Sequence, residues 1–223
     1  MDVKEAILKR RSIRSYKDIP ITKDDLIDIL VAGQYSPSAG NLQNWRFVII
    51  DDEDMKDRIA DACLNQDWMK SAPVFIVICT QEEKMKQFYP EHGHDFNVEG
   101  AAAVAQNMMI QATANGLGSC WVGAFHPDPI IDIIGIGNNF KPTIILTLGY
   151  SNEKVPCPCK IDMHSFTMRN GWNGFGRYRD INWALKDYST IMSKTIKGTR
   201  KSVSETVKNI HKHIRSKINK KGK

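Results

Sequence analysis

Three arginines stand close together near the start of the chain, in the stretch RRSIRSY (10–16). Arg10, Arg11 and Arg14 carry planar guanidinium groups whose N–H donors match phosphate oxygens, and Ser12 adds a hydroxyl donor. Cations also suit the C-terminal end of a helix, where they complement the helix dipole, but this accounts for only one or two of the arginines. The motif alone therefore leaves two interpretations open, an anion site or an ordinary helix end.

A second stretch, SPSAGNLQNW (36–45), combines residues that direct the backbone with residues that form hydrogen bonds. Pro37 stiffens the chain and Gly40 frees it, while Ser38, Asn41 and Gln43 supply hydroxyl and amide groups. The stretch precedes a predicted strand, a place where contacts to small ligands are often built, and its amides could recognise the edge of a heterocycle. The alternative is a loop that is merely polar.

A third stretch, NGLGSCWVGAF (115–125), contains three glycines. Gly116 suits the C-cap of a long helix. Gly123 is harder to explain, because glycine weakens a strand and often marks a close approach of the backbone to a ligand. The stretch does not fit GxGxxG, so the sequence does not support a Rossmann or P-loop nucleotide site.

Other patterns indicate the elements that would position these stretches. Helices are predicted over residues 3–11, 22–35, 53–63, 97–116 and 128–136, the fourth of them buried nearly all round. Strands are predicted over 45–52, 72–80, 119–125 and 143–150. Thr22 and Asp25 resemble a capping box, and residues 81–96 are predicted to be a polar connection that acts as a lid loop. The alternation of helices and short strands indicates an α/β or α+β fold with helices covering a sheet.

The bulk composition is that of a globular protein, with 223 residues, 42% of them hydrophobic and 25% charged. This length allows one domain with a sizeable core, or one domain and an appendage. No apolar run is long enough to span a membrane, and the N-terminus lacks the apolar region of a secretory signal. The five cysteines are scattered, so we expect no disulfide framework and a cytoplasmic location.

The three stretches occur in the order RRSIR, SPSAGNLQNW, EGAAAVAQNMMIQATANGLGSCWVGAF, followed by a proline-led helix and TIILTLGY. In this order and spacing they resemble the nitroreductase family over roughly residues 3–160. The resemblance implies an α+β nitroreductase-like fold, with a central mixed sheet flanked by helices and an intertwined homodimer. It also implies two FMN molecules at the dimer interface and no metal.

The resemblance implies a role for each matching residue. Arg10, Ser12 and Arg14 would hold the FMN phosphate and the pyrimidine edge of the ring, with Arg11 at a neighbouring contact. A guanidinium there would also stabilise the negative charge that a reduced flavin gathers near N1.

Two further segments match flavin-contact positions of the family. Beside flavin N5 would lie Val122, Gly123 and Ala124, with a backbone N–H of Gly123 or Ala124 donating to that nitrogen. From the partner subunit, a loop would contact the flavin through Pro37, Ser38, Ala39, Asn41 and Gln43. In this interpretation no side chain is a general acid or base, because the flavin carries the chemistry. Gln106 and Asn107 of the central helix are expected to be packing residues.

The implied activity is an NAD(P)H-dependent FMN oxidoreductase with a ping-pong cycle. Hydride would pass from NADH or NADPH to N5 and then to a nitroaromatic, a quinone or another small acceptor. One alternative is a flavin-binding module or regulator with a basic, nucleic-acid-binding tail and little turnover. Another is a family offshoot that acts on a different specific substrate.

The chain departs from the family pattern in VPCPCKIDM (155–163). Family members commonly carry basic residues there that reach the phosphate. Lys160 could serve in this way, but Cys157 and Cys159 stand where basic residues are usual, and this would lower the affinity for phosphate. A disulfide between these two cysteines would be strained, which favours free thiols.

The C-terminal part is predicted to be a separate extension, so we expect a domain over residues 1–168 and an extension over 169–223. Residues 194–223 carry eleven Lys or Arg and one acid, giving +10, so the other 193 residues sum to −4 of the total of +6. An aromatic and glycine-rich arm (169–183) would pack on the body or on the dimer partner. A basic amphipathic helix would follow, packing on the homodimer rather than on nucleic acid or an anionic membrane.

Overall fold

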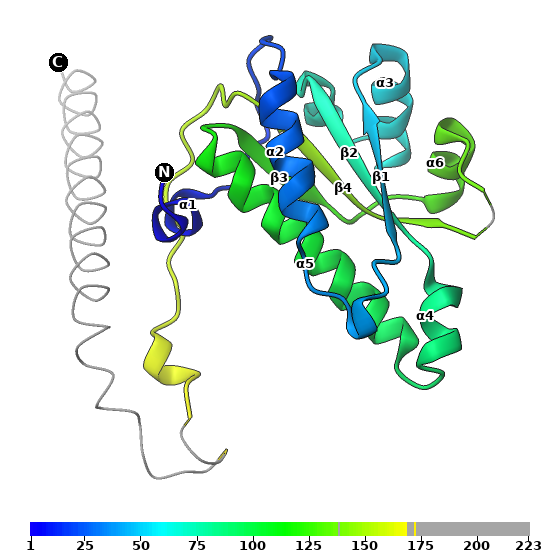
Figure 1. Cartoon of the computed structure of the whole chain (residues 1–223). Coiled ribbons are helices and arrows are strands. Elements are labelled where there is room, and N and C mark those ends of the chain that lie inside the picture. Colours follow the sequence, from blue (N-terminus) through cyan, green and yellow to red (C-terminus); the bar gives the residue numbers. More distant parts are fainter. Residues whose placement is uncertain (138, 169–171, 173–223) are drawn as a thin grey trace, which may run out of the picture. The chain divides into compact units, whose positions relative to one another are not determined.

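The computed structural model describes residues 1–137, 139–168 and 172, and the chain divides into two compact units, Met1–Pro158 and Cys159–Lys223 (Figure 1). The first unit contains all the α-helices and strands described below. The described part of the second unit contains a short 3-10 helix, η3 (Met163–Ser165). The predicted basic helix lies outside the described residues, as does the aromatic arm apart from the exposed Trp172. The predicted domain boundary after residue 168 remains a prediction.

The first unit is built on a four-stranded sheet with the strand order β1-β2-β4-β3. The strands are β1 (Trp45–Ile50), β2 (Val74–Thr80), β3 (Gly118–Val122) and β4 (Lys141–Gly149). The predicted α+β class is confirmed. All three pairings of strands in this described sheet are antiparallel, so the mixed character that we expected is limited to a parallel bridge between Ser12 and Ser119.

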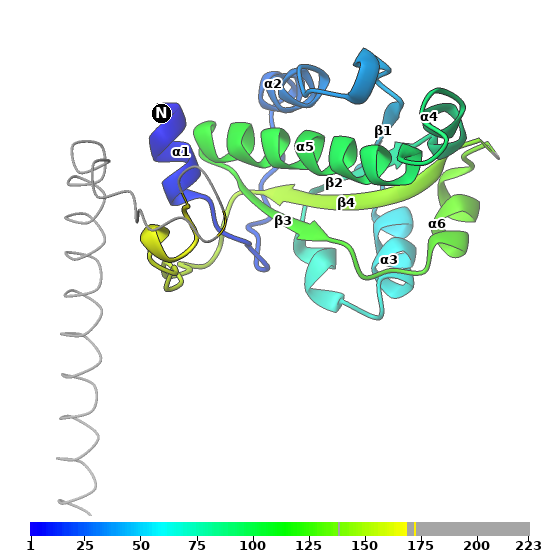
Figure 2. The ribbon, with the colours of Figure 1, turned by 90° about the horizontal axis from the view of Figure 1, so that it is seen from below.

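Helices cover both faces of the sheet (Figure 2). One face carries α5 (Gly93–Ala114), on which α1 (Val3–Lys9) and α2 (Lys23–Gln34) pack, and the other carries α3 (Glu53–Ala62) and α6 (Pro127–Ile134). The central strand β2 is buried along its whole length, as predicted, because it faces both layers. Its alternate residues enter different cores: Phe75, Val77 and Cys79 face α3 and α6, whereas Ile76 and Ile78 face α5.

Local signals in the sequence explain where the helices begin. The Thr22 hydroxyl accepts a hydrogen bond from the backbone N–H of Asp25 at 3.1 Å and donates to its carboxylate at 2.7 Å, so Thr22 is the N-cap of α2. The predicted capping box is only half formed, because among the described residues the Asp25 carboxylate binds the Thr22 hydroxyl and not its backbone N–H. Asp52 caps α3 through the N–H of Met55. Pro127 opens α6, where its missing N–H is not needed.

The prediction of a loop over residues 81–96 was wrong. Most of this stretch is helical, with α4 at Glu82–Phe88 and α5 beginning at Gly93. Ion pairs one turn apart stabilise α4, since Lys86 reaches Glu82 at 2.6 Å and Glu83 at 3.3 Å. Gly93 lets α5 start directly against α4, because a Cβ there would lie 2.7 Å from the backbone of Lys86.

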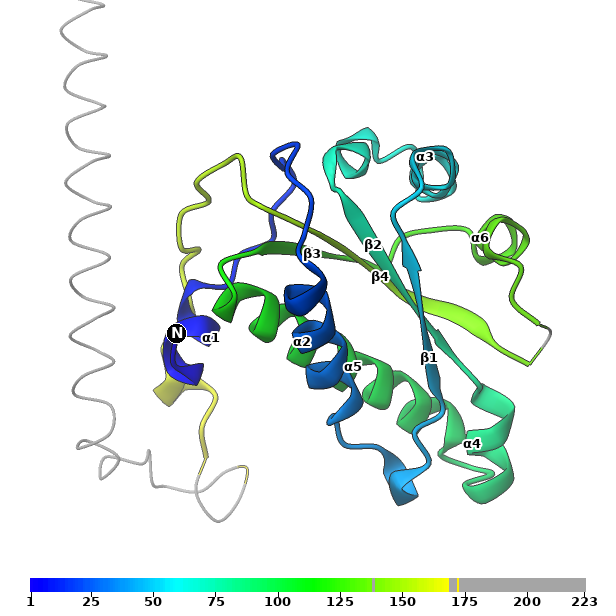
Figure 3. The same cartoon turned by 45° about the horizontal axis from the view of Figure 1, so that its top comes forward.

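Helix α5 is less buried in the single chain than its sequence predicts. Ala101, Val104 and Met108 are fully buried against the sheet, but Val98 is 45% exposed and Gln106 is also exposed. Nearby, residues of α2 and of the edge strand β1 line an apolar groove of about 420 Å³. Figure 3 shows the course of these two elements. Its lining residues include Ile27, Val31, Trp45, Phe47 and Ile49. One side of the first unit therefore keeps apolar surface open.

Candidate functional site

The arginine stretch, which follows α1 and precedes α2 in the sequence, lies against strand β3 of the sheet. The N–H of Ile13 donates to the carbonyl of Ser119 on β3 at 3.0 Å, and Ile13 is buried. Gly118 makes this approach possible, because a Cβ there would lie 2.8 Å from Ile13 Cγ1. Tyr16 anchors the other end, since its hydroxyl donates to the Ile13 carbonyl at 2.7 Å and lies 2.7 Å from Thr147 Oγ1. Because Ile13 and Tyr16 are buried, the side chain of Arg14 between them is left exposed.

The two interpretations of the arginine stretch apply to different arginines. Arg11 turns back onto α1 and donates to the carbonyls of Leu8 at 2.7 Å and Arg10 at 2.6 Å, which is a helix-end role. Within the described residues, no Asp or Glu oxygen lies within 4.0 Å of the guanidinium nitrogens of Arg10, Arg11 or Arg14. Arg10 and Arg14 thus form no ion pair with a carboxylate of the described chain. That arrangement suits an external anion.

Two groups beside these arginines also lack partners. Arg11 Nε and Ser119 Oγ are buried and make no hydrogen bond within the described residues. A buried donor without a partner costs about 1–3 kcal/mol, so such groups are uncommon away from functional sites. Both belong to segments that meet at the bridge between Ser12 and Ser119. The chemistry of this corner, cations plus free donors, fits a phosphate-bearing ligand.

Arg14 connects the arginine stretch to the end of β3 through two residues that the sequence analysis missed. Its guanidinium lies over the Trp68 ring, 5.7 Å from the centroid. The Trp68 indole N–H donates to Gln66 Oε1 at 3.3 Å, and Gln66 Nε2 donates to the Ala124 carbonyl at 3.3 Å. Arg14, Trp68, Gln66 and Ala124 therefore form one continuous wall.

The segment before Gln66 has a strained backbone. Leu64 and Asn65 have φ angles of +59° and +53°, a region that costs free energy for residues other than glycine. The left-handed conformation of these two residues turns the chain sharply after α3 and places Gln66 beside Ala124. In the sequence, LNQDW carries only the ordinary signal of a polar loop, so strain at this point could not be predicted.

The end of β3 presents open backbone at the predicted N5 position. Val122 is buried at 3% exposure, whereas Gly123 and Ala124 are exposed. A Cβ at Gly123 would meet only Trp121 Nε1 at 3.4 Å and Trp121 Cδ1 at 3.8 Å. The fold itself does not require glycine here, so the backbone is open to a close approach from outside.

Cys120 lies in the field of the arginine stretch. Burial raises the pKa of its thiol, and the charge of Arg14 and a hydrogen bond from Ser12 offset part of that rise in pKa. Burial also raises the pKa of the Tyr16 hydroxyl well above its ordinary value. Both groups are therefore neutral at physiological pH, and neither is an anion that could pair with the arginines.

The amide loop, residues 36–45, is also strained. Gly40, Asn41 and Gln43 have φ angles of +55°, +54° and +43°. Hydrogen bonds inside the loop hold this shape, because the N–H of Gln43 donates to Ser38 Oγ at 3.1 Å and its Nε2 donates to the Asn41 carbonyl at 3.2 Å. Strain of this kind persists where surrounding contacts fix the backbone, and it is common at ligand sites.

A buried polar network fixes the two ends of the amide loop to α5. Asn44 Nδ2 donates to Asn97 Oδ1 at 2.6 Å, and Asn97 Nδ2 donates to Thr80 Oγ1 at 3.0 Å. At the other end, Asn107 Nδ2 donates to Ser36 Oγ at 2.9 Å. Asn107 is therefore a packing residue, as expected. Asn97 is a positioning residue that helical periodicity alone did not reveal.

The structure does not bring the amide loop and the arginine stretch together within one chain. The loop ends at Asn44, beside Asn97 in the first turns of α5, whereas the arginines lie beyond the other end of α5, against β3 (Figure 1). Asn97 and Ala114 are separated by about 26 Å along the helix axis, at 1.5 Å per residue. Asn107, which holds Ser36 at the other end of the loop, is about 10 Å from Ala114 on the same scale, so the loop runs along α5 away from the arginines.

The family model described as "Nitroreductase family" matches residues 7–66 and 62–150. The chain belongs to the nitroreductase family. The match includes the arginine stretch, the amide loop, the strained segment before Gln66 and the end of β3.

Curated relatives of this nitroreductase-family chain cover most of its first unit. An NADH dehydrogenase of Thermus thermophilus is 30% identical over 183 residues, with 69% of this chain and 89% of that protein covered. An NAD(P)H FMN reductase of Bacillus subtilis is 29% identical over 168 residues, covering 69% of this chain and 67% of that protein.

Solved structures confirm the nitroreductase-like fold. An FMN-dependent nitroreductase of Clostridium difficile is 27% identical, with a TM-score of 0.66 over 75% of this chain and 98% of that chain. The structure of B. megaterium NfrA2 has a TM-score of 0.71 over 95% of this chain and 92% of that chain. At 20% identity, the second comparison supports the fold alone.

The remaining predicted site residue of this nitroreductase-family chain, Lys160, belongs to the second unit. It is exposed, and its role at the phosphate remains a prediction. Cys157 is an exposed free thiol of the first unit, and Cys159 is an exposed free thiol of the second. Across the described ranges, no helix has the length and apolar character needed to cross a membrane.

Proposed function

We propose that this nitroreductase-family chain is an FMN-dependent oxidoreductase that accepts hydride from NADH or NADPH. It passes the electrons to a nitroaromatic, a quinone or another small acceptor. The observation that carries this proposal is the pairing of two guanidiniums that form no ion pair among the described residues, those of Arg10 and Arg14, with the exposed backbone at Gly123 and Ala124. Trp68 and Gln66 connect Arg14 to Ala124.

The residues present fit FMN in charge and in hydrogen-bonding capacity. Arg10, Ser12 and Arg14 would hold the phosphate and the pyrimidine edge, because a phosphate close to dianionic needs the charge that these arginines leave free. Arg11 would contribute less, since its guanidinium already serves α1.

At the other side of the ring, the exposed backbone of Gly123 and Ala124 would lie beside N5, with Val122 supporting it from the core. When bound, FMN supplies two-electron hydride chemistry, which no side chain of this chain can supply. The chain's own contribution is to bind, orient and electrostatically stabilise that group. Relatives named as FMN reductase and FMN-dependent nitroreductase support this assignment.

The proposal includes a homodimer. Since the amide loop runs along α5 away from the arginine stretch, it would reach a flavin held by the other protomer, through Pro37, Ser38, Ala39, Asn41 and Gln43. The apolar surface of α5 and α2, including Val98, Ile27 and Val31, is of the kind that a second copy buries. A ping-pong cycle follows if donor and acceptor use the same open face of the flavin in turn.

The test is reconstitution of the purified full-length chain with FMN, followed by sizing with multi-angle light scattering. The account predicts one FMN per chain, a dimeric mass, and parallel double-reciprocal plots when donor and acceptor are varied. A chain that binds no FMN would contradict the proposal. A chain that binds FMN as a monomer would contradict only the role of the amide loop in trans.

A further inference from the structure

Glu153, on the segment that follows β4, contacts the backbone of the arginine stretch. Its Oε1 accepts hydrogen bonds from the N–H of Arg14 at 2.6 Å and from the N–H of Ser15 at 3.1 Å. Two consecutive backbone donors that point at one oxygen form an anion-binding arrangement. The chain fills this arrangement with its own carboxylate.

A short ladder holds Glu153 in place. Ser151 Oγ donates to the Glu153 carbonyl at 2.7 Å and lies 3.2 Å from the Glu153 N–H, which donates to it. On either side, the N–H of Asn152 donates to the Ser15 carbonyl at 2.9 Å and the N–H of Lys17 donates to the Tyr150 carbonyl at 2.8 Å. The carboxylate is thus fixed relative to Arg14, although it is exposed.

The carboxylate uses the backbone of Arg14 and leaves the guanidinium free. No ion pair within 4.0 Å joins Glu153 to any arginine in the described part of the chain. The Arg14 guanidinium instead lies over Trp68. Glu153 therefore fixes the backbone of Arg14, and with it the starting point of the Arg14 side chain. It does so without forming an ion pair with the Arg14 guanidinium.

We propose that Glu153 is a positioning residue for the flavin phosphate, acting through the backbone of Arg14 and Ser15. The inference rests on the proposed function. Charge-assisted hydrogen bonds of this length are roughly twice as strong as neutral ones, so a carboxylate holds the two residues more firmly than a neutral acceptor would. In the opposite role, the Glu153 carboxylate would compete with the phosphate for this arrangement, and removing the carboxylate would tighten FMN binding.

The experiment compares the full-length wild type with Glu153→Ala, Glu153→Gln and the control Asp57→Ala. Asp57 is an exposed acid on α3, away from these contacts. Dissociation constants are measured for FMN and for riboflavin, which lacks the phosphate. A role in folding alone would move both constants together, whereas positioning of the phosphate contacts changes their ratio.

We expect Glu153→Ala to weaken FMN binding about tenfold, and riboflavin binding by less than about threefold. Glu153→Gln keeps an acceptor oxygen and should lie between the wild type and Glu153→Ala, while Asp57→Ala should match the wild type. If Glu153→Ala does not fold, the Gln variant decides by the same ratio.

Three results would overturn the inference: an unchanged ratio, tighter FMN binding in the variants, or an equal effect in Asp57→Ala. If the wild type itself bound no FMN, both the proposed function and this inference would fail. If the wild type bound FMN and the Glu153 variants bound it equally well, only this inference would fail.

Discussion

The guanidinium of Arg14 lies over the ring of Trp68, 5.7 Å from its centroid, and this contact connects the arginine stretch to the segment that supports Ala124. The two residues are 54 positions apart, on the N-terminal stretch and on the 3-10 helix η2 (Asp67–Ser71). This cation–π contact holds the guanidinium without consuming its charge. Arg14 is therefore oriented and available at the same time.

Arg14→Ala should weaken FMN binding by about tenfold to a hundredfold, the range for loss of a hydrogen bond to a charged group. Arg14→Lys should be intermediate, because lysine keeps the charge and loses the planar fork. Binding is measured by flavin fluorescence during titration of the apoprotein.

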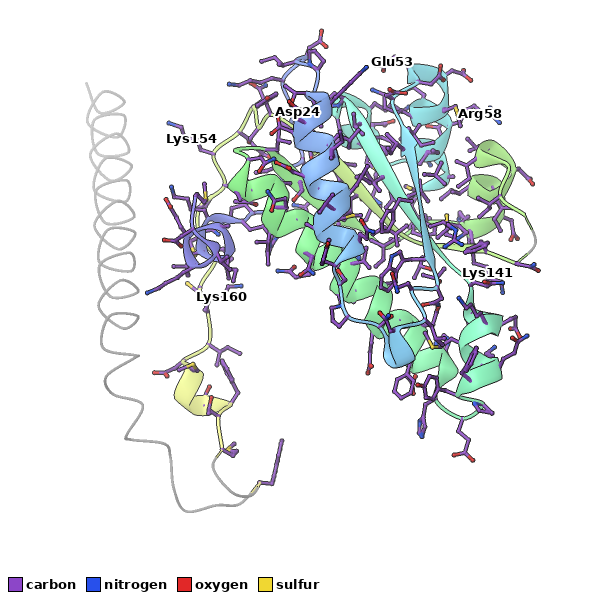
Figure 4. The ribbon with its side chains drawn as sticks, in the orientation of Figure 1. Asp24, Glu53, Arg58, Lys141, Lys154 and Lys160 are labelled. Atoms are coloured by element: carbon purple, nitrogen blue, oxygen red, sulfur yellow. The ribbon has the colours of Figure 1, made fainter. Side chains whose placement is uncertain are left out.

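The matched control for Arg14 is Arg58→Ala, which removes an exposed arginine of α3, on the far side of the unit from α2 (Figure 4). It should leave FMN binding within a factor of two of the wild type. Equal losses in the two variants would mean that overall charge, and not the placement of Arg14, governs binding.

Gly123→Val should abolish flavin reduction while leaving the thermal midpoint nearly unchanged. A side chain at Gly123 meets only the indole edge of Trp121 at 3.4 Å, so the fold tolerates it, but the ligand would lose its close approach to the backbone. Gly118→Val is the comparison, since its Cβ would press on Ile13 and cost about 1–3 kcal/mol in the free energy of unfolding. Full flavin reduction by Gly123→Val would show that the N5 assignment is wrong.

Asn97→Leu should lower the free energy of unfolding by about 1–2 kcal/mol, because it removes two buried hydrogen bonds, although Asn44 keeps its bond to the Gln81 carbonyl and Thr80 its bond to Thr143. It should also loosen the amide loop and lower the fraction of dimer. Urea unfolding and sizing measure the two effects. Asn115→Ala, which removes surface hydrogen bonds to Asp25 and Asp28, should cost less than about 1 kcal/mol.

Stability should fall as the pH rises above about 9. Burial raises the pKa of Cys63 and of Cys79 from 9.0 to about 12. Between these values the unfolded chain releases thiol protons that the native chain retains, so each thiol lowers the free energy of unfolding by about 1.4 kcal/mol per pH unit. Thermal midpoints from pH 8 to 11 test this, and Cys79→Ala should flatten the slope. A midpoint that is constant across this range would contradict it.

Most of the elements were predictable from the sequence because their signals are local. The N-cap at Thr22, the apolar run of β2 and the proline at the start of α6 each determine structure within a few residues. Residues 81–96 were misjudged because their polar composition concealed good helix formers and ion pairs one turn apart. The open face of α5 could not be predicted, because an apolar helix looks the same whether its own chain or a second copy buries it.

The three candidate stretches could be found from their residue types, and the family resemblance implied their flavin roles. The residues that surround these stretches in the fold could not be predicted. Gln66, Trp68 and Glu153 act through contacts with residues 58, 54 and 139 positions away, and only the fold creates these contacts. The strain at Leu64 and Asn65 depends on where α3 must stop. Sequence patterns could assign Arg11 a role in anion binding, whereas only the structure shows its guanidinium turned onto α1.

The most direct measurement is an absorption spectrum of the purified full-length chain, followed by anaerobic titration with NADPH and then with NADH. The account predicts a flavin band that bleaches with one equivalent of donor per flavin, and the more effective donor identifies the physiological one. A flavin band that neither donor bleaches would contradict the oxidoreductase function and favour a flavin-binding module. A colourless chain that FMN cannot reconstitute would contradict the site itself.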